Sequence, residues 1–180
     1  RVGSGQVRVE DAQGAPPNIP FWLGEAPPRT AELSAAVAGL RADVRDRLGD
    51  VQAATAWLRA ECGLDQAGAE QLLAYVSETV AALGEVPSQQ TVIAERFFDE
   101  AGGMQLVVHA PFGGRINRAW GLAMRKRFCV TFDFELQAAA TDDGFVLSLG
   151  EQHSFPVSDA FGLVRASNLQ DALEQATLAA

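Results

Sequence analysis

The sequence predicts an α+β fold that combines a mixed or antiparallel sheet, an inserted helical block and a basic amphipathic helix. Apolar residues recur with helical spacing between Thr30 and Gly84, and short β-rich runs replace that pattern after Pro87. Residues 115–127 then hold five of the 14 Lys and Arg residues and no acid, although the chain has a net charge of -9. With 180 residues, 48% of them hydrophobic, we expect a single domain over residues 1–180.

The helical block is expected to contain three helices. Thr30 is placed as the N-cap of the first helix, which would end near Gly49. A second helix follows over residues 51–62, and Asp65 caps a third that stops at Gly84. The apolar stripe of the first helix comprises Leu33, Val37, Leu40, Val44 and Leu48. The break between the second and third helices resembles a helix-turn-helix, but the acidic residues around it would repel phosphates, so we interpret it as scaffold.

Strands are expected before the helical block and on both sides of the basic helix. Their expected ranges are residues 5–12, 91–98, 104–112, 132–140 and 145–150. The Asp143-Gly144 pair is the strongest hairpin-turn signal, and the residues after Pro156 are expected to form two short helices. Because the chain begins at Arg1 as if in the middle of a sheet, we expect it to be a piece of a longer polypeptide.

The basic stretch is expected to form a helix over residues 115–128, directly after the Gly113-Gly114 turn. On a helical wheel the apolar side comprises Ile116, Ala119, Trp120, Ala123 and Met124. The opposite side, called here the basic face, comprises Arg115, Arg118, Arg125 and Lys126. Arg127 projects beside the apolar side instead, where we expect it to pair with a core carboxylate or to stack on an aromatic ring.

The first turn of this helix is a candidate phosphate site. Helix N-termini bind anions because their first amide groups lack intrahelical acceptors and the helix dipole adds positive charge. Gly113-Gly114 followed by Arg115, Asn117 and Arg118 would therefore form a cradle for a nucleic-acid phosphate. The pattern alone leaves a second interpretation open, in which the same residues are a solvated basic face after a tight turn.

The proline-rich stretch "IPFWLGE" offers a second candidate contact. Trp22 on a loop stiffened by prolines loses little entropy on binding, and single-stranded bases stack on such rings. Alternatively, Phe21 and Trp22 fill a gap between the sheet and the helices, as most tryptophans do.

No catalytic or metal-binding pattern accompanies these candidates. Cys62 and Cys129 lie far apart, with only His109 and His153 as further soft ligands, so we expect no metal and two buried free thiols. A hydrolase using either histidine lacks a nucleophile motif and an orienting acid, and we expect structural histidines instead. Nothing predicts a signal peptide or a membrane span, so we expect a cytoplasmic protein without membrane partners.

Four blocks together resemble a known family. In order they are "GQVRVEDAQGAPPNIPFWLGEAPPRT", "HAPFGGRINRAWGLAMRKRF", "FELQAAATDDGFVLSLG" and "HSFP". They resemble the DEAD/H-associated region of Lhr-type (large helicase-related) ATP-dependent DNA helicases of bacteria and archaea. The resemblance spans nearly the whole chain.

The resemblance implies an accessory domain that follows two RecA-like motor domains and a winged-helix domain and helps to channel single-stranded DNA. The longer protein would be a 3′-to-5′ helicase acting on DNA and RNA:DNA hybrids in DNA repair. Its motor domains would bind ATP and magnesium, so this fragment needs no cofactor and is not itself an enzyme. A family tryptophan that couples translocation to unwinding matches Trp22. The alternative is a structural module that docks on the motor domains without touching DNA.

Overall fold

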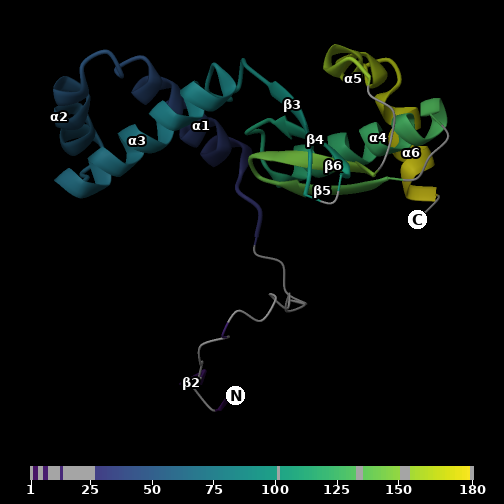
Figure 1. Cartoon of the computed structure of the whole chain (residues 1–180), viewed down its shortest axis with the longest axis horizontal. Coiled ribbons are helices and arrows are strands. Elements are labelled where there is room, and N and C mark those ends of the chain that lie inside the picture. The colour runs from purple at the N-terminus through teal and green to yellow at the C-terminus, as the bar shows by residue number, and fades with distance from the viewer. Residues whose placement is uncertain are drawn as a thin grey trace.

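The structure, a computed structural model, describes residues 2–3, 6–7, 13, 27–100, 102–132, 136–150 and 155–178. Within these residues, a three-helix block lies at one end of a four-stranded sheet, a fourth helix packs along the sheet, and two further helices lie towards the other end (Figure 1). The expected α+β class is thereby confirmed.

The helical block contains α1 (Ala31–Arg45), α2 (Val51–Glu61) and α3 (Gln66–Leu83). Each helix begins at a side-chain cap, as Thr30 and Asp65 led us to expect, because the cap oxygen accepts from an amide in the first turn. Helix α3 ends at Gly84, whose φ of 81° is left-handed. Helix α1 ends at Arg45, four residues before Gly49. The N–H groups of Arg47 and Leu48 donate to carbonyl oxygens three residues earlier rather than four, so the chain leaves the α-helical pattern before the α2 cap.

The helical block has a hydrophobic core of its own. Its buried members are Val44, Ala54, Leu58, Ala69, Leu73, Val76 and Val86. Leu33, expected in the buried stripe of α1, is 51% exposed. The first turns of α1 bury Ser34 and Ala38 instead, and Ser34 lies against Gly113 from the start of the basic helix.

The sheet is antiparallel throughout and has the order β3-β4-β6-β5. Its strands are β3 (Ile93–Phe98), β4 (Met104–His109), β5 (Gln137–Thr141) and β6 (Gly144–Gly150). The Asp143-Gly144 turn joins β5 to β6 and the expected hairpin is confirmed. A separate pair, β1 (Val2–Gly3) with β2 (Gln6–Val7), covers part of the first expected strand.

Helices α4 (Gly114–Phe132), α5 (Val157–Leu163) and α6 (Leu169–Leu178) accompany the sheet. Helix α4 packs on β5, β6 and α6, and it continues to Phe132, into the range expected for a strand. The second core lies between α4 and the inner sheet face, whose alternating residues include Leu106, Val108, Phe145 and Leu147. The two short helices expected in the tail are confirmed as α5 and α6.

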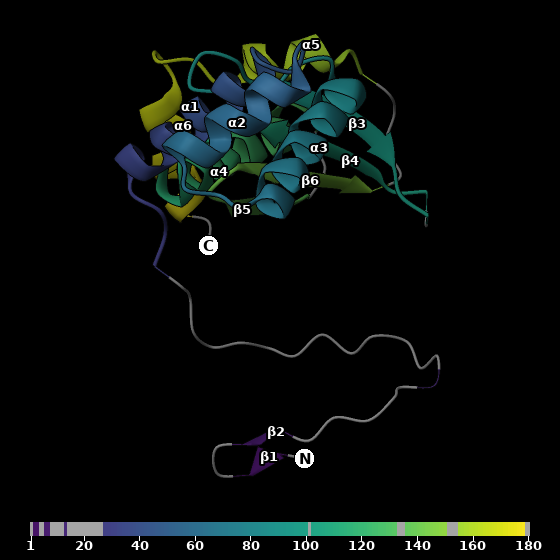
Figure 2. The same ribbon diagram turned by 90° about the vertical axis from the view of Figure 1, so that its left-hand side faces the viewer.

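The described residues therefore form two hydrophobic cores, one in the helical block and one between the sheet and α4 to α6. The sheet together with α4, α5 and α6 is called here the sheet layer. Figure 2 looks along the molecule from the helical-block end, with the sheet layer behind it. The segment that leads into α1 and the start of α4 meet where the two parts join, and the candidate site lies there.

Candidate functional site

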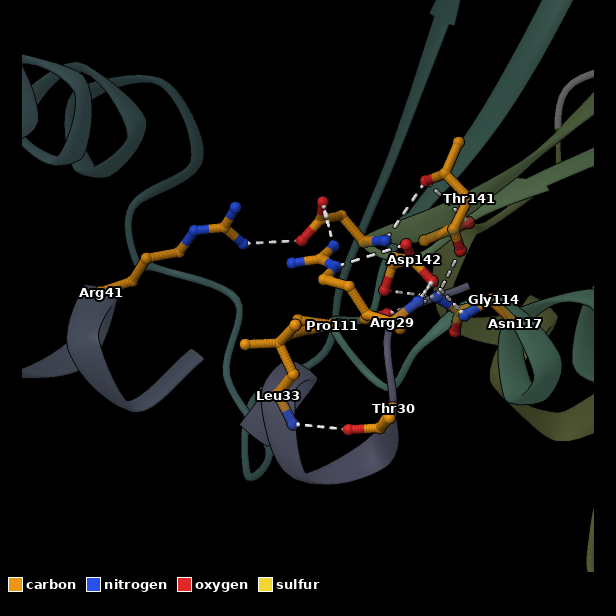
Figure 3. Close-up of polar contacts among 12 residues, drawn as sticks. Arg29, Thr30, Leu33, Arg41, Pro111, Gly114, Asn117, Thr141 and Asp142 are labelled. Atoms are coloured by element: carbon orange, nitrogen blue, oxygen red, sulfur yellow. Dashed lines mark hydrogen bonds and ion pairs between the residues drawn. The ribbon is translucent and has the colours of Figure 1, made fainter. Parts of the chain in front are cut away.

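A carboxylate from the β5–β6 turn joins three segments of the chain (Figure 3). Asp142 Oδ1 accepts from the Gly114 N–H at 2.7 Å, at the first residue of α4, and from the Arg29 N–H at 3.1 Å. Asp142 Oδ2 lies 3.4 Å from Arg29 Nε. These hydrogen bonds and the ion pair lower the pKa of Asp142, with the Gly114 amide the largest cause and partial burial opposing it.

The neighbouring Asp143 extends this arrangement into the helical block. Its carboxylate lies 2.5 Å from Arg29 Nη2 and 2.9 Å from Arg41 Nη1, and Arg41 belongs to α1. Arg29, Arg41, Gly114, Asp142 and Asp143 are called here the Asp142 junction. The junction fixes the segment ahead of α1, the body of α1 and the start of α4 against one hairpin turn.

The junction changes how the Gly113-Gly114 turn works. The Gly114 amide, which the sequence pattern assigned to a phosphate, donates to Asp142 instead. Gly113 has a φ of 93°, and an added Cβ there would lie 3.1 Å from Ser34 Oγ. An added Cβ at Gly114 would lie 3.1 Å from Asp142 Oδ1. Both glycines thus permit close packing of α4 on the junction.

Asn117 is fully buried, although it was expected beside a phosphate. Its side-chain amide donates to the carbonyl oxygens of Ala110 at 2.7 Å, Thr141 at 3.0 Å and Asp142 at 3.2 Å. Asn117 therefore connects α4 to the segment that follows β4 and to the β5–β6 turn. Its side chain points into the protein and not to the surface of α4.

The basic face lies largely at the surface. Arg115, Arg118 and Arg125 are exposed, and Lys126 is partly buried. Arg127 is also partly buried, and its Nε is buried without a hydrogen-bond partner in the described part of the chain. No ion pair of Arg127 occurs among the described residues, so its expected carboxylate pairing is not seen there.

The apolar side of α4 faces the core, with one exception. Trp120 stacks on Phe112 with ring centroids 6.4 Å apart and meets Phe145 edge-on at 5.3 Å. Ala123 and Met124 are buried, as expected. Ile116 is 50% exposed instead, because it faces a groove rather than the sheet.

This groove, called here the proline groove, has a volume of about 450 Å³. One wall is formed by residues 27–32, which include two consecutive prolines and the start of α1. Phe112, Gly113, Arg115 and Ile116 form the other wall. The groove therefore opens beside the Asp142 junction, between the segment ahead of α1 and the first turn of α4.

The structure describes some, but not all, of the other residues that the sequence analysis singled out. Trp22 and His153 lie outside the described residues. His109 Nε2 lies 2.7 Å from Glu95 Oε1, so that histidine has a partner on the neighbouring strand. Cys62, expected to be buried, is exposed because it follows the last residue of α2 at a surface turn. Within the described ranges no group of three or more metal-ligating side chains occurs, and no helix is long and apolar enough to cross a membrane.

Sequence reasoning missed the junction itself. Asp143 was interpreted as a hairpin-turn residue only, and Arg29 received no role. The signals that pointed to them are two adjacent acids at a tight turn and an arginine directly before a helix cap. Neither signal shows which distant segment the acids contact.

The fold and site define an α+β domain in which α4 buries its apolar side and exposes arginine side chains. Residues 86–180 match the protein family described as DEAD/H associated. The chain belongs to this family, as the four sequence blocks implied.

Three curated proteins named as Lhr helicases are similar to this chain in sequence. The Mycolicibacterium smegmatis protein named "Lhr helicase/ probable uracil glycosylase" is 30% identical over 151 residues, which cover 84% of this chain and 10% of that protein. The Escherichia coli "Lhr helicase/uracil glycosylase" is 28% identical, covering 78% and 9%. The Saccharolobus solfataricus "ATP-dependent helicase Lhr-Core" is 23% identical, covering 96% and 20%. This chain thus spans about a tenth to a fifth of the length of these relatives.

A solved structure shares the fold. The structure titled "Structure of Mycobacterium smegmatis helicase Lhr bound to ssDNA and AMP-PNP" matches with a TM-score of 0.74 and 27% identity. The match covers 92% of this chain and 21% of that one.

Proposed function

We propose that this chain is an accessory domain of an Lhr-type ATP-dependent helicase and contacts single-stranded DNA through Trp22 and the basic face. Membership of the DEAD/H associated family and the likeness to an Lhr structure with bound single-stranded DNA support the proposal. In that role the domain helps to channel the strand and to couple translocation to unwinding.

The proposal places catalysis elsewhere in the longer protein. The RecA-like motor domains would bind ATP and magnesium, and this domain would contact them and the winged-helix domain without a cofactor of its own. The longer protein would translocate 3′ to 5′ on DNA or RNA:DNA hybrids in the cytoplasm and serve DNA repair.

The observation that carries the proposal is the segregation of charge on α4. Arg115, Arg118 and Arg125 project from one helix at the surface, although the chain has a net charge of -9. Phosphates are attracted to such a local concentration of positive charge even when the protein as a whole is acidic. Because Asn117 is buried and the Gly114 amide is engaged, the side chains of the basic face are left to make the contact.

Salt-dependent binding of a labelled single strand to this chain tests the basic face. In Arg115→Ala/Arg118→Ala, we expect weaker binding and a salt slope reduced by about 1.4, since each single-strand phosphate contact contributes about 0.7. Arg59→Ala removes an exposed arginine from α2 in the helical block and should leave binding unchanged. Equal affinity and slope in the double variant would contradict DNA contact and favour the structural module that docks on the motor domains.

Trp22 is tested in the longer protein. Trp22→Ala should leave DNA-stimulated ATP hydrolysis intact while lowering the rate of duplex unwinding. Unwinding at the wild-type rate would remove Trp22 from the proposal.

A further inference from the structure

We propose that the proline groove holds one unstacked base of the single strand, with the adjoining phosphate bound by Arg115. This inference rests on the proposed function, because it assumes that a strand runs along the basic face. It assigns a second base contact that is separate from Trp22.

The shape and chemistry of the groove suit a nucleobase. Its volume of about 450 Å³ lies within the range of small-ligand sites. Pro27, Pro28 and Phe112 supply apolar surface, and Ile116 contributes a side chain that is 50% exposed. A base taken out of its stack is held between apolar and aromatic side chains of this kind.

The charges around the groove set the direction in which a nucleotide would lie. Arg115 is exposed on the α4 wall, and Arg118 follows one turn later on the basic face. Glu32 lies on the opposite wall, where a backbone amide and the Thr30 hydroxyl hold its pKa below the usual range. The Glu32 carboxylate repels a phosphate, so the phosphate belongs on the Arg115 side and the base towards the prolines.

The Asp142 junction keeps the two walls at a fixed separation. Asp142 Oδ1 bonds to Arg29 N–H on the first wall and to Gly114 N–H at the base of the second. Ser34 Oγ, buried and without a partner among the described residues, lies under Gly113 on the groove lining. The groove is thus built from rigid elements rather than from a loop alone.

The test compares two oligonucleotides with equal numbers of phosphates, an oligothymidine and an abasic strand of the same length. The comparison is made in the full chain carrying Trp22→Ala, so that stacking on Trp22 does not contribute. We expect this variant to prefer the oligothymidine by roughly fivefold, which corresponds to the lower end of the free energy of stacking one base. Adding Ile116→Ser should abolish the preference with no change in salt slope.

Val130→Ser is the matched control. Val130 is 60% exposed and also belongs to α4, but it lies outside the groove lining, so its variant should keep the base preference. A preference that persists in Ile116→Ser, or one that is absent already in Trp22→Ala, would overturn the groove assignment. Loss of thermal stability in Ile116→Ser without a change in base preference would show that the protein's own chain fills the groove, and would overturn it too.

Failure of the proposed function gives a different result. If the basic face does not bind DNA, adding Arg115→Ala/Arg118→Ala to the Trp22→Ala variant leaves its weak binding of both oligonucleotides unchanged. If only the groove assignment fails, the Trp22→Ala variant binds both with the full salt slope but without a difference between them.

Discussion

Asp142 Oδ1 lies 2.7 Å from the backbone nitrogen of Gly114, so a turn carboxylate occupies the amide at the start of α4. The same oxygen accepts from the Arg29 N–H at 3.1 Å. A helix start that looked available for an outside anion therefore already holds one from the chain itself. DNA contact in the proposed function depends on the arginine side chains of α4 rather than on its backbone.

Replacing Asp142 tests the importance of that carboxylate. Asp142→Asn keeps the size of the side chain but removes the charge that faces Arg29 and the start of α4. We expect the melting temperature to fall by roughly several degrees, as measured by circular dichroism.

Asp143→Asn is the control for this substitution. The Asp143 side chain is 47% exposed, and the ion pairs that it makes within the described ranges are with arginine side chains, so its loss should lower the melting temperature less. Equal losses in the two variants would show that the helix-start contact adds nothing to the ion pairs.

The lowered pKa of Asp142 predicts how this difference depends on pH. Its folded-state pKa lies below its ordinary value of 3.8, so the stabilisation is complete above that value and is lost as the pH falls through the folded-state pKa. The gap in melting temperature between wild type and Asp142→Asn should be constant near neutrality and should close below about pH 4. A gap that stays constant to the lowest pH at which the chain folds would contradict the assignment.

Asn117 should matter for stability and not for DNA. Asn117→Ala removes the three hydrogen bonds that this buried amide donates to the carbonyl oxygens of Ala110, Thr141 and Asp142, and we expect a loss of about 1–3 kcal/mol in the free energy of unfolding. Denaturant titration measures this loss, and the salt slope of DNA binding by the folded variant should equal that of the wild type. Asn168→Ala, which removes two local bonds, one donated to Leu163 O and one accepted from the Arg165 N–H, should cost less because Asn168 is only partly buried. A reduced salt slope in Asn117→Ala would restore Asn117 to the phosphate contact.

Gly144 is required by a close approach of two strands. An added Cβ would overlap the carbonyl oxygen of Val108 on the paired strand β4, so Gly144→Ala should cost about 3 kcal/mol or more. Gly39→Ala is the opposite case, because Gly39 lies within α1 with no atom near the added methyl group. That variant should gain about 0.5–1 kcal/mol in denaturant unfolding. Equal effects of the two substitutions would show that strand contact does not select glycine.

The elements of the fold could be predicted from sequence because their signals are local. Thr30 and Asp65 cap helices through amides three residues away, and the Asp143-Gly144 turn pairs neighbouring strands. The end of α4 could not be placed, because the run that continues past Phe128 is also typical of a strand.

The site depended on contacts that no local pattern carries. The helix-start pattern placed Asn117 beside a phosphate in the first turn, but the β5–β6 hairpin covers that position and buries it. Asp142 lies 113 residues from Arg29 and 28 from Gly114 in the sequence, so its role follows only from the folded arrangement. The exposure of Arg115, Arg118 and Arg125, by contrast, was predictable, because solvent exposure on an amphipathic helix follows from the spacing of its residues.

The two hydrophobic cores have a consequence for how the chain opens. The helical block and the sheet layer are each held by apolar burial, which salt does not screen, whereas Arg29 and Arg41 join them partly through Coulombic contacts to Asp142 and Asp143. Added salt should therefore loosen the connection before it weakens either half. Hydrogen exchange would then resolve the helical block and the sheet layer as two cooperative unfolding units. The ionic environment around a bound DNA strand would set how independently these two units open.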